Sequence, residues 1–347
     1  MRLWEEVQKM SRQGLKKSKK PERVFSKRER VLETLAGKEV DKRPFTFWHP
    51  FGLSHMKGES LAAAALTFAA TYGVDLLRLP AVRDIPLQPQ ASLDRPHDLT
   101  TIEELPGHAG FWSERFEALT SISRLNENRI AVFESIPEPL TALSYLCRSE
   151  LIQQAEKNHR SFLEKGLESI TASLKNYLST LLKANCVDGL VVEIESATYE
   201  AREPEQFESL VKPYLRDLLN FITQESEVPI WLHVRGTRVY LKPLVDLPHQ
   251  MISWSHLSAG PKLDRAFPRG YKGVIAGGID DKALSNMSFQ DIRKHVEEAR
   301  NQYVSFLCIG DHLSSDTSPR QLQALSYFLK KRDWSPNKDD ETKPDSP

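Results

Sequence analysis

The sequence has few cysteines, no surplus of charge of either sign and no long hydrophobic run. Its three cysteines, Cys147, Cys186 and Cys308, are far apart and odd in number, which excludes a disulfide scaffold and predicts buried free thiols of a reducing compartment. The 47 basic residues balance 47 acidic ones, so no global field attracts nucleic acid or an anionic membrane. No run reaches the about 18 apolar residues of a membrane span, and the first 27 residues lack the apolar core of a secretion signal. We therefore expect a cytoplasmic protein.

The composition is that of a chain able to bury a large core. Hydrophobic residues make up 40% of the 347 residues and charged residues 27%, which is typical of a soluble globular enzyme. This length lies within the range that a single α/β barrel reaches, so a second domain is not required.

Polar segments flank the part of the chain that is expected to fold. Residues 1–25 form a flexible basic arm containing the run Lys16-Lys17-Ser18-Lys19-Lys20, and residues 334–347 form a tail of disordered composition. Ser26 and Glu29 have the spacing of a helix capping box before a short apolar stripe that ends at Gly37. We therefore place the folded domain at residues 26–333.

Short β-type runs alternate with helical patterns across this domain. The strand candidates are Phe45–Trp48, Val74–Leu79, Arg129–Phe133, Val187–Val192, Val228–His233, Gln250–Trp254, Gly273–Ala276 and Val304–Cys308. The helical patterns are 59–72, 151–182, 204–223 and 289–300. Most strand candidates are continuous apolar runs, as expected where both faces of a parallel sheet are buried.

Eight such strands joined by helices predict a (β/α)8 TIM barrel, although a doubly wound open sheet would give a similar pattern. The stretch from Arg83 to Glu104 is rich in Pro, Asp and Gln, and it is expected to be a long loop that forms a lid or a pocket wall.

Several segments, taken together and in order, resemble the uroporphyrinogen decarboxylase family, which also includes corrinoid-dependent methyltransferases and whose barrel is related to that of cobalamin-independent methionine synthase. The matching segments are 27–37, 72–75, 139–145, 187–196, 232–236, 277–280 and 310–317. Each is short, and the ordered set carries the resemblance. It implies a (β/α)8 barrel whose C-terminal mouth holds the substrate, and a homodimer.

The resemblance implies two alternative chemistries. The decarboxylases release CO2 from a carboxylated tetrapyrrole without metal or organic cofactor, with arginines and backbone amides fixing the carboxylates. The methyltransferases bind zinc through a His-x-Cys pair and a later Cys, and they work with a corrinoid or a corrinoid protein. A protein that binds a tetrapyrrole or corrinoid without catalysis is the third reading.

Candidate site residues follow from these segments. Tyr145 and Ser196 match a tyrosine and a serine that contact substrate in the decarboxylases. Glu195 follows a strand and points into the barrel mouth, and Glu193 shares its face of the strand. The two carboxylates are expected to act as acid and base or, equally, to be ion-paired to Arg235.

The family's zinc pattern is broken in this sequence. His233 is followed by Arg235 where the methyltransferases have Cys, and a guanidinium does not bind zinc. Asp311 stands at the position of the later Cys, with His312 beside it, and either of the two could face the pocket. We expect His233 and Asp311 to be catalytic together with Glu195, and His312 to bind substrate. We expect no cofactor, and the alternative is a zinc ion held by His233, Asp311 and His312.

The stretch after the first strand lacks the arginine-rich signature of true decarboxylases and offers Trp48 and His49 instead. His49 is expected to bind substrate, and anionic groups would be held by arginines on or just after other strands. The further substrate-binding candidates are Arg78, Arg83, Arg235 and Gly278, the last in the pair Gly277-Gly278 that precedes Asp280. The expected function is cofactor-free decarboxylation, and the alternative is corrinoid-dependent methyl transfer.

Overall fold

The computed structural model describes residues 23–48, 56–79, 93–267 and 271–331 of the chain. Within them, α2 (Lys27–Leu35) begins with the predicted capping box, in which the Ser26 hydroxyl accepts the Glu29 N–H and the Glu29 carboxylate accepts the Ser26 N–H. Nearly all of the basic arm, and the whole tail, lie outside the described residues.

Eight parallel strands form one sheet, and all eight predicted strands are confirmed with bounds shifted by a few residues. The strands are β1 (Phe45–Thr46), β2 (Leu76–Leu79), β3 (Ala131–Pro137), β4 (Gly189–Ile194), β5 (Ile230–Val234), β6 (Met251–Trp254), β7 (Val274–Ile279) and β8 (Phe306–Ile309). Their order is β1-β8-β7-β6-β5-β4-β3-β2, so each strand from β2 to β8 pairs with its neighbour in sequence and β1 pairs with β8. A doubly wound sheet would instead reverse its order at a central strand.

The first and last strands of this order meet and close the barrel. The Asp75 N–H donates to the Phe45 carbonyl at 2.9 Å, and the Thr46 hydroxyl donates to the Leu76 carbonyl at 2.7 Å. The Asp75 carboxylate accepts the Phe45 N–H at 3.1 Å and is itself paired with Arg30 of α2. The sheet is therefore a (β/α)8 TIM barrel, as predicted.

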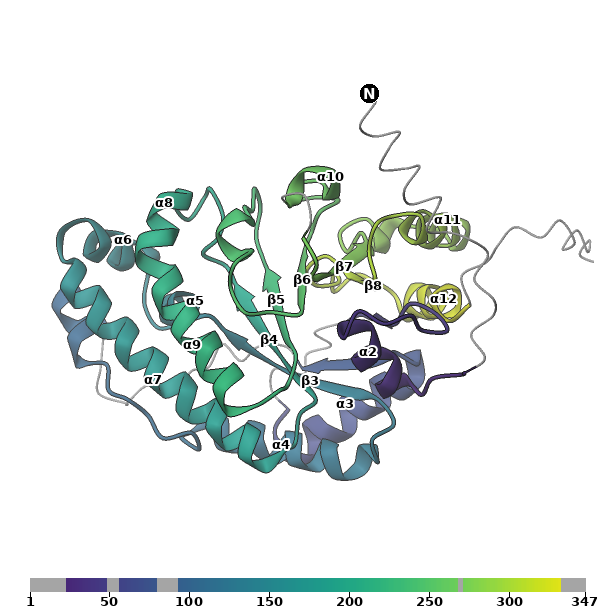
Figure 1. The fold of residues 1–347 in the computed structure, drawn as a ribbon, viewed down its shortest axis with the longest axis horizontal. Coiled ribbons are helices and arrows are strands. Elements are labelled where there is room, and N and C mark those ends of the chain that lie inside the picture. Colours follow the sequence, from purple (N-terminus) through teal and green to yellow (C-terminus); the bar gives the residue numbers. More distant parts are fainter. Residues whose placement is uncertain (1–22, 49–55, 80–92, 268–270, 332–347) are drawn as a thin grey trace, which may run out of the picture.

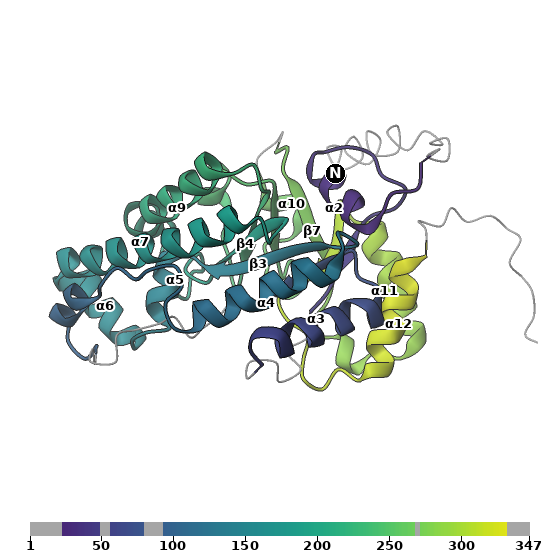
Figure 2. The ribbon, with the colours of Figure 1, turned by 90° about the horizontal axis from the view of Figure 1, so that it is seen from below.

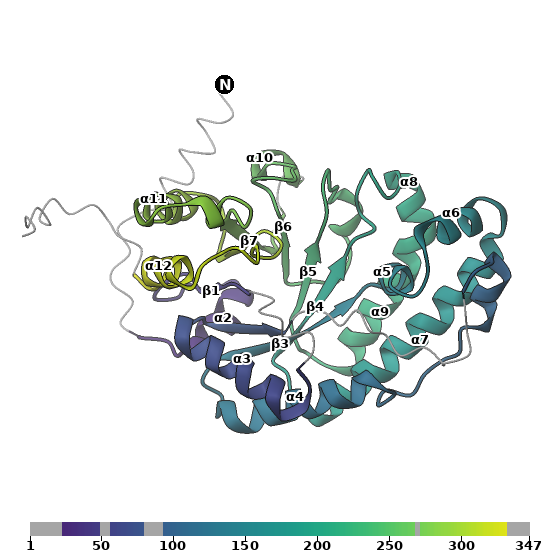
Figure 3. The same cartoon turned by 180° about the vertical axis from the view of Figure 1, so that it is seen from behind.

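Helices surround the barrel (Figure 1). The longer ones are α3 (Gly58–Tyr72), α4 (Phe111–Asn126), α6 (Ser149–Asn158), α7 (Arg160–Ala184), α9 (Lys212–Glu225), α11 (Phe289–Arg300) and α12 (Pro319–Lys330). The shorter ones are η2 (Pro96–Thr101), α5 (Pro139–Ser144), α8 (Pro204–Gln206), η3 (Phe207–Val211), η4 (Lys242–Leu244), α10 (Leu263–Ala266) and η5 (Leu284–Asn286). Helices α7 and α9 lie together on one side and α11 and α12 on the other (Figure 3), while α3 and α4 run side by side beneath the strands (Figure 2).

Two helix predictions are wrong in detail. The pattern 151–182 is two helices, because the backbone leaves helical conformation at His159, with φ −143° and ψ 45°, and the His159 ring stacks on Phe162. The pattern 204–223 contains the π-helical η3, which ends just before Pro213. Since Pro213 has no N–H to give to the carbonyl of Ser209, that carbonyl accepts from Arg160 at 2.7 Å instead.

Alternate residues of the strands point into the barrel and out toward the helices. On β3, Phe133 fills the interior, and any side chain at Gly189 of β4 would collide with its ring at 2.3 Å. Its neighbour Glu134 points outward and pairs with Arg115 of α4. On β5, Trp231 and the site residue His233 share the inward face.

The predicted thiols and the long loop are only partly as expected. Cys186 and Cys308 are buried free thiols, whereas the free thiol Cys147 is only half-buried. Of the loop, residues 93–104 carry η2, which packs on α6 and α7. Among the described helices, none is long and apolar enough to cross a membrane.

Candidate active site

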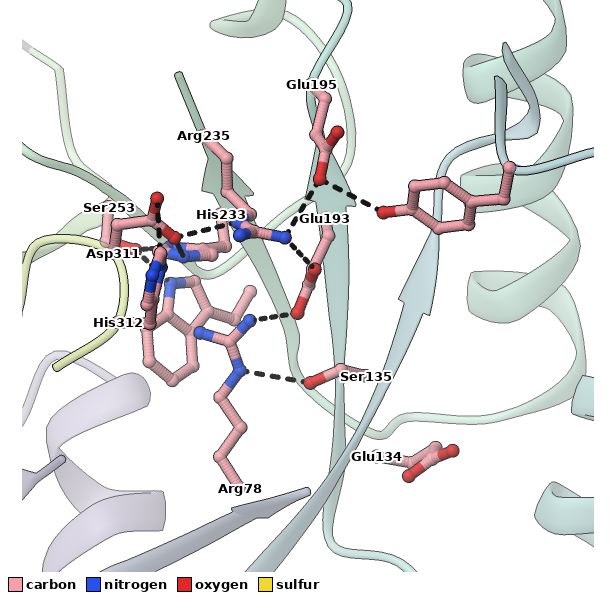
Figure 4. Close-up of polar contacts among 12 residues, drawn as sticks. Arg78, Glu134, Ser135, Glu193, Glu195, His233, Arg235, Ser253, Asp311 and His312 are labelled. Atoms are coloured by element: carbon pink, nitrogen blue, oxygen red, sulfur yellow. Dashed lines mark hydrogen bonds and ion pairs between the residues drawn. The ribbon is translucent and has the colours of Figure 1, made fainter. Parts of the chain in front are cut away.

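Polar side chains gather at the C-terminal mouth of the barrel, where β4, β5 and β8 end (Figure 4). A pocket of about 310 Å³ opens there. It is lined by Glu195, Thr198, Glu200, Arg235, Gly236, Thr237 and Asp311. This is the size at the lower end of sites for small ligands.

Arg235 holds the centre of this group. Its Nε donates to Asp311 at 2.7 Å, and its Nη1 donates to Glu195 at 2.8 Å and to Glu193 at 3.2 Å. Burial alone would lower the pKa of Arg235, but the three carboxylates raise it. The alternative in which Glu193 and Glu195 are ion-paired to Arg235 is therefore the one found.

A second guanidinium, that of Arg78 on β2, lies deeper in the barrel. Its Nη2 donates to Glu193 at 2.5 Å and its Nε to Ser135 at 3.0 Å. Glu193 thus bridges the two arginines, one at the mouth and one inside (Figure 4). The two cations and three carboxylates of this layer carry a net charge of one minus, with Asp311 included.

Ser253 of β6 determines which nitrogen of His233 carries its proton. The Ser253 oxygen lies 2.7 Å from the indole nitrogen of Trp231 and 2.7 Å from Nδ1 of His233. An indole N–H only donates, so the serine hydroxyl is left to donate to Nδ1, because no other described residue accepts its proton. The proton of neutral His233 is then on Nε2, which faces Asp311 at 3.9 Å.

The charge states of these groups follow from their surroundings. Burial, helped by the nearby positive charge of Arg78, lowers the pKa of His233 to about 4, so the imidazole is neutral at neutral pH. Burial would raise the pKa of Asp311, but His233, His312 and Arg235 together lower it well below its usual range. Hydrogen bonding to Asp311 in turn raises the pKa of His312.

Replacing Ser253 by Ala is expected to release His233 from its single tautomer. The variant removes the donor to Nδ1 and leaves the Trp231 N–H without an acceptor, which we expect to lower the free energy of unfolding by about 1–3 kcal/mol. Nitrogen-15 NMR of labelled histidine measures the tautomer directly. A His233 signal that stays in the Nε2–H form in Ser253→Ala would contradict the assignment.

The structure brings together some of the predicted residues. Tyr145 donates to Glu195 at 3.0 Å, and Asp311 faces inward to Arg235. Between Asp311 and His312, it is Asp311 that lines the pocket, while the side chain of His312 is 57% exposed beside it.

Other predicted residues lie elsewhere. Ser196 is buried near the carboxylate of Glu138, and Gly278 is buried against Ala299 of α11, 3.1 Å from where its side chain would begin. Trp48 packs inside the barrel against Arg78. His49 and Arg83 lie outside the described residues.

Several supporting residues escaped sequence reasoning. Glu138, the N-cap of α5, accepts from the hydroxyl of Thr141, which in turn accepts the Glu195 N–H at 3.0 Å and so fixes the end of β4. An acidic residue before Pro139 is a helix-start signal that identifies this cap. Ser253 carries no such signal, because only the closed barrel brings it to the site.

A metal does not fit the donors present. Among the described residues, no group of three or more His, Cys, Asp or Glu side chains is placed to hold a metal ion. The carboxylate of Asp311 is bonded to the permanent cation of Arg235, which would repel a second cation from His233 and His312.

Eight parallel strands with a polar C-terminal mouth define a TIM-barrel protein. The sequence model of the uroporphyrinogen decarboxylase (URO-D) family matches residues 66–331, and the chain belongs to this family, whose members are enzymes. No curated protein matches the chain.

Two solved structures show the same barrel. A methyltransferase from Methanosarcina mazei has a TM-score of 0.72 and 17% identity, covering 88% of this chain and 98% of that one. A putative vitamin-B12 independent methionine synthase from Listeria monocytogenes has a TM-score of 0.53 and 11% identity, covering 83% of this chain and 95% of the other. At these identities, the likeness is one of fold.

Proposed function

We propose that the protein is a metal-free lyase that removes CO2 from a carboxylated tetrapyrrole or a related acid at the barrel mouth. The observation that carries the proposal is the bonding of Arg235, which stands at the place of a zinc-binding Cys and is held by Asp311, Glu195 and Glu193. This arrangement replaces the thiolate site that zinc-dependent methyl transfer needs, and it leaves one nitrogen of the guanidinium for a substrate carboxylate.

Each part of the mouth has a role in such a reaction. The Nη2 atom of Arg235 donates to no described residue, so it is the donor that the pocket offers to a substrate carboxylate. Asp311 and Glu195 hold the guanidinium in one orientation, and Tyr145 in turn holds Glu195. After CO2 leaves, a proton from water in the open pocket replaces it on carbon.

Release of CO2 from candidate acids under anaerobic conditions tests the proposal. The panel is uroporphyrinogen, coproporphyrinogen and small acids that lose CO2 readily. Arg235→Lys keeps the charge but loses the forked geometry, and we expect it to lower the rate about 10²-fold. Arg238→Lys, an exposed substitution three residues away, is the matched control and should leave the rate unchanged.

A methylcobalamin-to-thiol transfer assay with metal analysis is run on the same protein. Methyl transfer by a zinc-loaded protein would replace the proposal with the methyltransferase alternative. Tight tetrapyrrole or corrinoid binding without turnover of any kind would instead indicate a non-catalytic carrier.

A further inference from the structure

Two buried N–H groups beside the mouth have no hydrogen-bond acceptor among the described residues. They are Nη1 of Arg78 and Nε2 of His233. Arg78 is 4% exposed and His233 is fully buried, so bulk water does not satisfy either group. Every other nitrogen of these two side chains is bonded: those of Arg78 to Glu193 and Ser135, and Nδ1 of His233 to Ser253.

The two side chains lie against the same pair of indole rings. The guanidinium carbon of Arg78 lies 4.0 Å from the ring centre of Trp48 and 5.1 Å from that of Trp231. The His233 ring lies 5.6 Å and 5.9 Å from the same two rings. In Figure 4, the free nitrogen of Arg78 points away from Glu193, toward the side on which His233 and Asp311 lie. The indole rings make this an apolar setting, in which hydrogen bonds are stronger than in water.

Neither donor lines the pocket, but one of them lies close to a residue that does. Nε2 of His233 lies 3.9 Å from Asp311, which is one of the residues that line the pocket. The His233 donor therefore lies just behind the pocket wall, near the end of β5 that Arg235 follows. Leaving such donors unsatisfied is unfavourable, which is why unpaired buried groups often mark a site that a ligand completes.

We propose that Arg78 and His233 form a site for a substrate oxygen that becomes negatively charged as CO2 leaves. The inference rests on the proposed function and narrows its substrate to a 3-oxo acid, with the carboxylate at Arg235 and the ketone oxygen at Arg78 and His233. The bond between carbon 2 and the carboxyl carbon breaks, its electron pair forms the enolate whose oxygen accepts both N–H groups, and water then protonates carbon 2. The products are CO2, a ketone and the hydroxide left by the water, and no oxidant or reductant is needed.

The state of His233 suits this role. A neutral imidazole is a hydrogen-bond donor that does not give up its proton to the enolate, and Ser253 directs the donating nitrogen to the site. The negative charge that opposes this role is that of Asp311, which is ion-paired to Arg235 at 2.7 Å.

The probe for this site is 4-nitrophenol, whose absorbance distinguishes the anion from the neutral form. We expect the protein to bind the anion in preference to the neutral form, which lowers the pKa of the bound phenol, and to shift the nitrogen-15 signal of His233 Nε2. His233→Phe should weaken binding of the anion about 10–100-fold, because one hydrogen bond to a charged group is lost. His249→Phe, which replaces a histidine at the opposite end of β6, is the matched control and should bind normally.

Results with the wild-type protein alone can overturn the proposal, so it does not depend on the folding of a variant. Binding of the neutral phenol in preference to the anion, or binding that leaves the His233 signal unmoved, would show that the two donors hold only water. Because the probe is not turned over, binding at the donors without CO2 release from any acid would contradict the proposed reaction and leave the oxygen site standing.

Discussion

Replacing Arg115 by Met is expected to lower the free energy of unfolding by about 3–5 kcal/mol. Arg115 of α4 makes two hydrogen bonds from Nε and one from Nη2 to Glu134 of β3, at 2.8–3.0 Å, and Tyr177 of α7 adds a fourth at 3.0 Å. Glu134 is fully buried, so without Arg115 its charge is left in the protein interior with a tyrosine as its remaining partner among these residues. Urea unfolding followed by circular dichroism measures the loss.

A double variant tests whether the unpaired charge of Glu134 causes this loss of stability. Arg115→Met combined with Glu134→Leu removes both charges, and we expect it to regain most of the lost stability, because apolar pairs often replace buried ion pairs without cost. The loss in Arg115→Met should also be smaller at pH 4 than at pH 8, since protonation relieves the buried charge of Glu134. A single variant within about 1 kcal/mol of wild type would show that the pair does not hold α4 to the barrel.

Asp281→Asn is expected to stabilise the protein at pH 8 and to have little effect at pH 3. Asp281 follows β7, is 2% exposed, and has the Ser255 hydroxyl at 3.4 Å as a weak partner. Unlike the carboxylates of Glu134, Glu193 and Asp311, it is paired with no cation among the described residues. Burial raises its pKa from 3.8 to about 6.

The pH dependence of the Asp281→Asn effect follows from the raised pKa of Asp281. The folded protein holds the proton of Asp281 more tightly than the unfolded chain, so the associated stability is present below about pH 4 and is lost as the pH rises through about 6. Asn removes that loss, which amounts to about 3 kcal/mol at pH 8. The measurement is urea unfolding of both proteins across this range, with exposed Asp316→Asn as the control. A difference that is the same at pH 4 and pH 8 would refute the prediction.

The strands could be predicted because buried parallel strands are continuous apolar runs, and β2, β5 and β6 are 4% exposed or less at every apolar position. Helix α4 does not appear in the apolar pattern because its buried face includes the polar residues Arg115, Ser121 and Asn126. The partners that make these residues compatible with burial lie on other elements. A pattern within one segment cannot show them.

The candidate site, too, could be predicted only in part. Glu195, Arg235 and Asp311 each follow a strand, and strand ends meet at one mouth, so their convergence could be predicted. The arrangement of the carboxylates around the guanidinium of Arg235 could not be predicted, because it depends on side-chain direction. Ser253 lies inside the barrel within an ordinary apolar strand, and its importance comes from the two rings, Trp231 and His233, that its hydroxyl joins.

The closure of the barrel has a consequence for how the chain folds. Strand β1 is two residues long, and its ladder partner is β8, with Phe45 opposite Leu307, so the first strand pairs with the last. Contacts between the ends of a chain carry a large entropic cost and form late when local contacts can form first. We therefore expect β2 to β7 to assemble as an open sheet before β1 and β8 join. During synthesis, we expect the mouth of the barrel to stay incomplete until the ribosome has made α12.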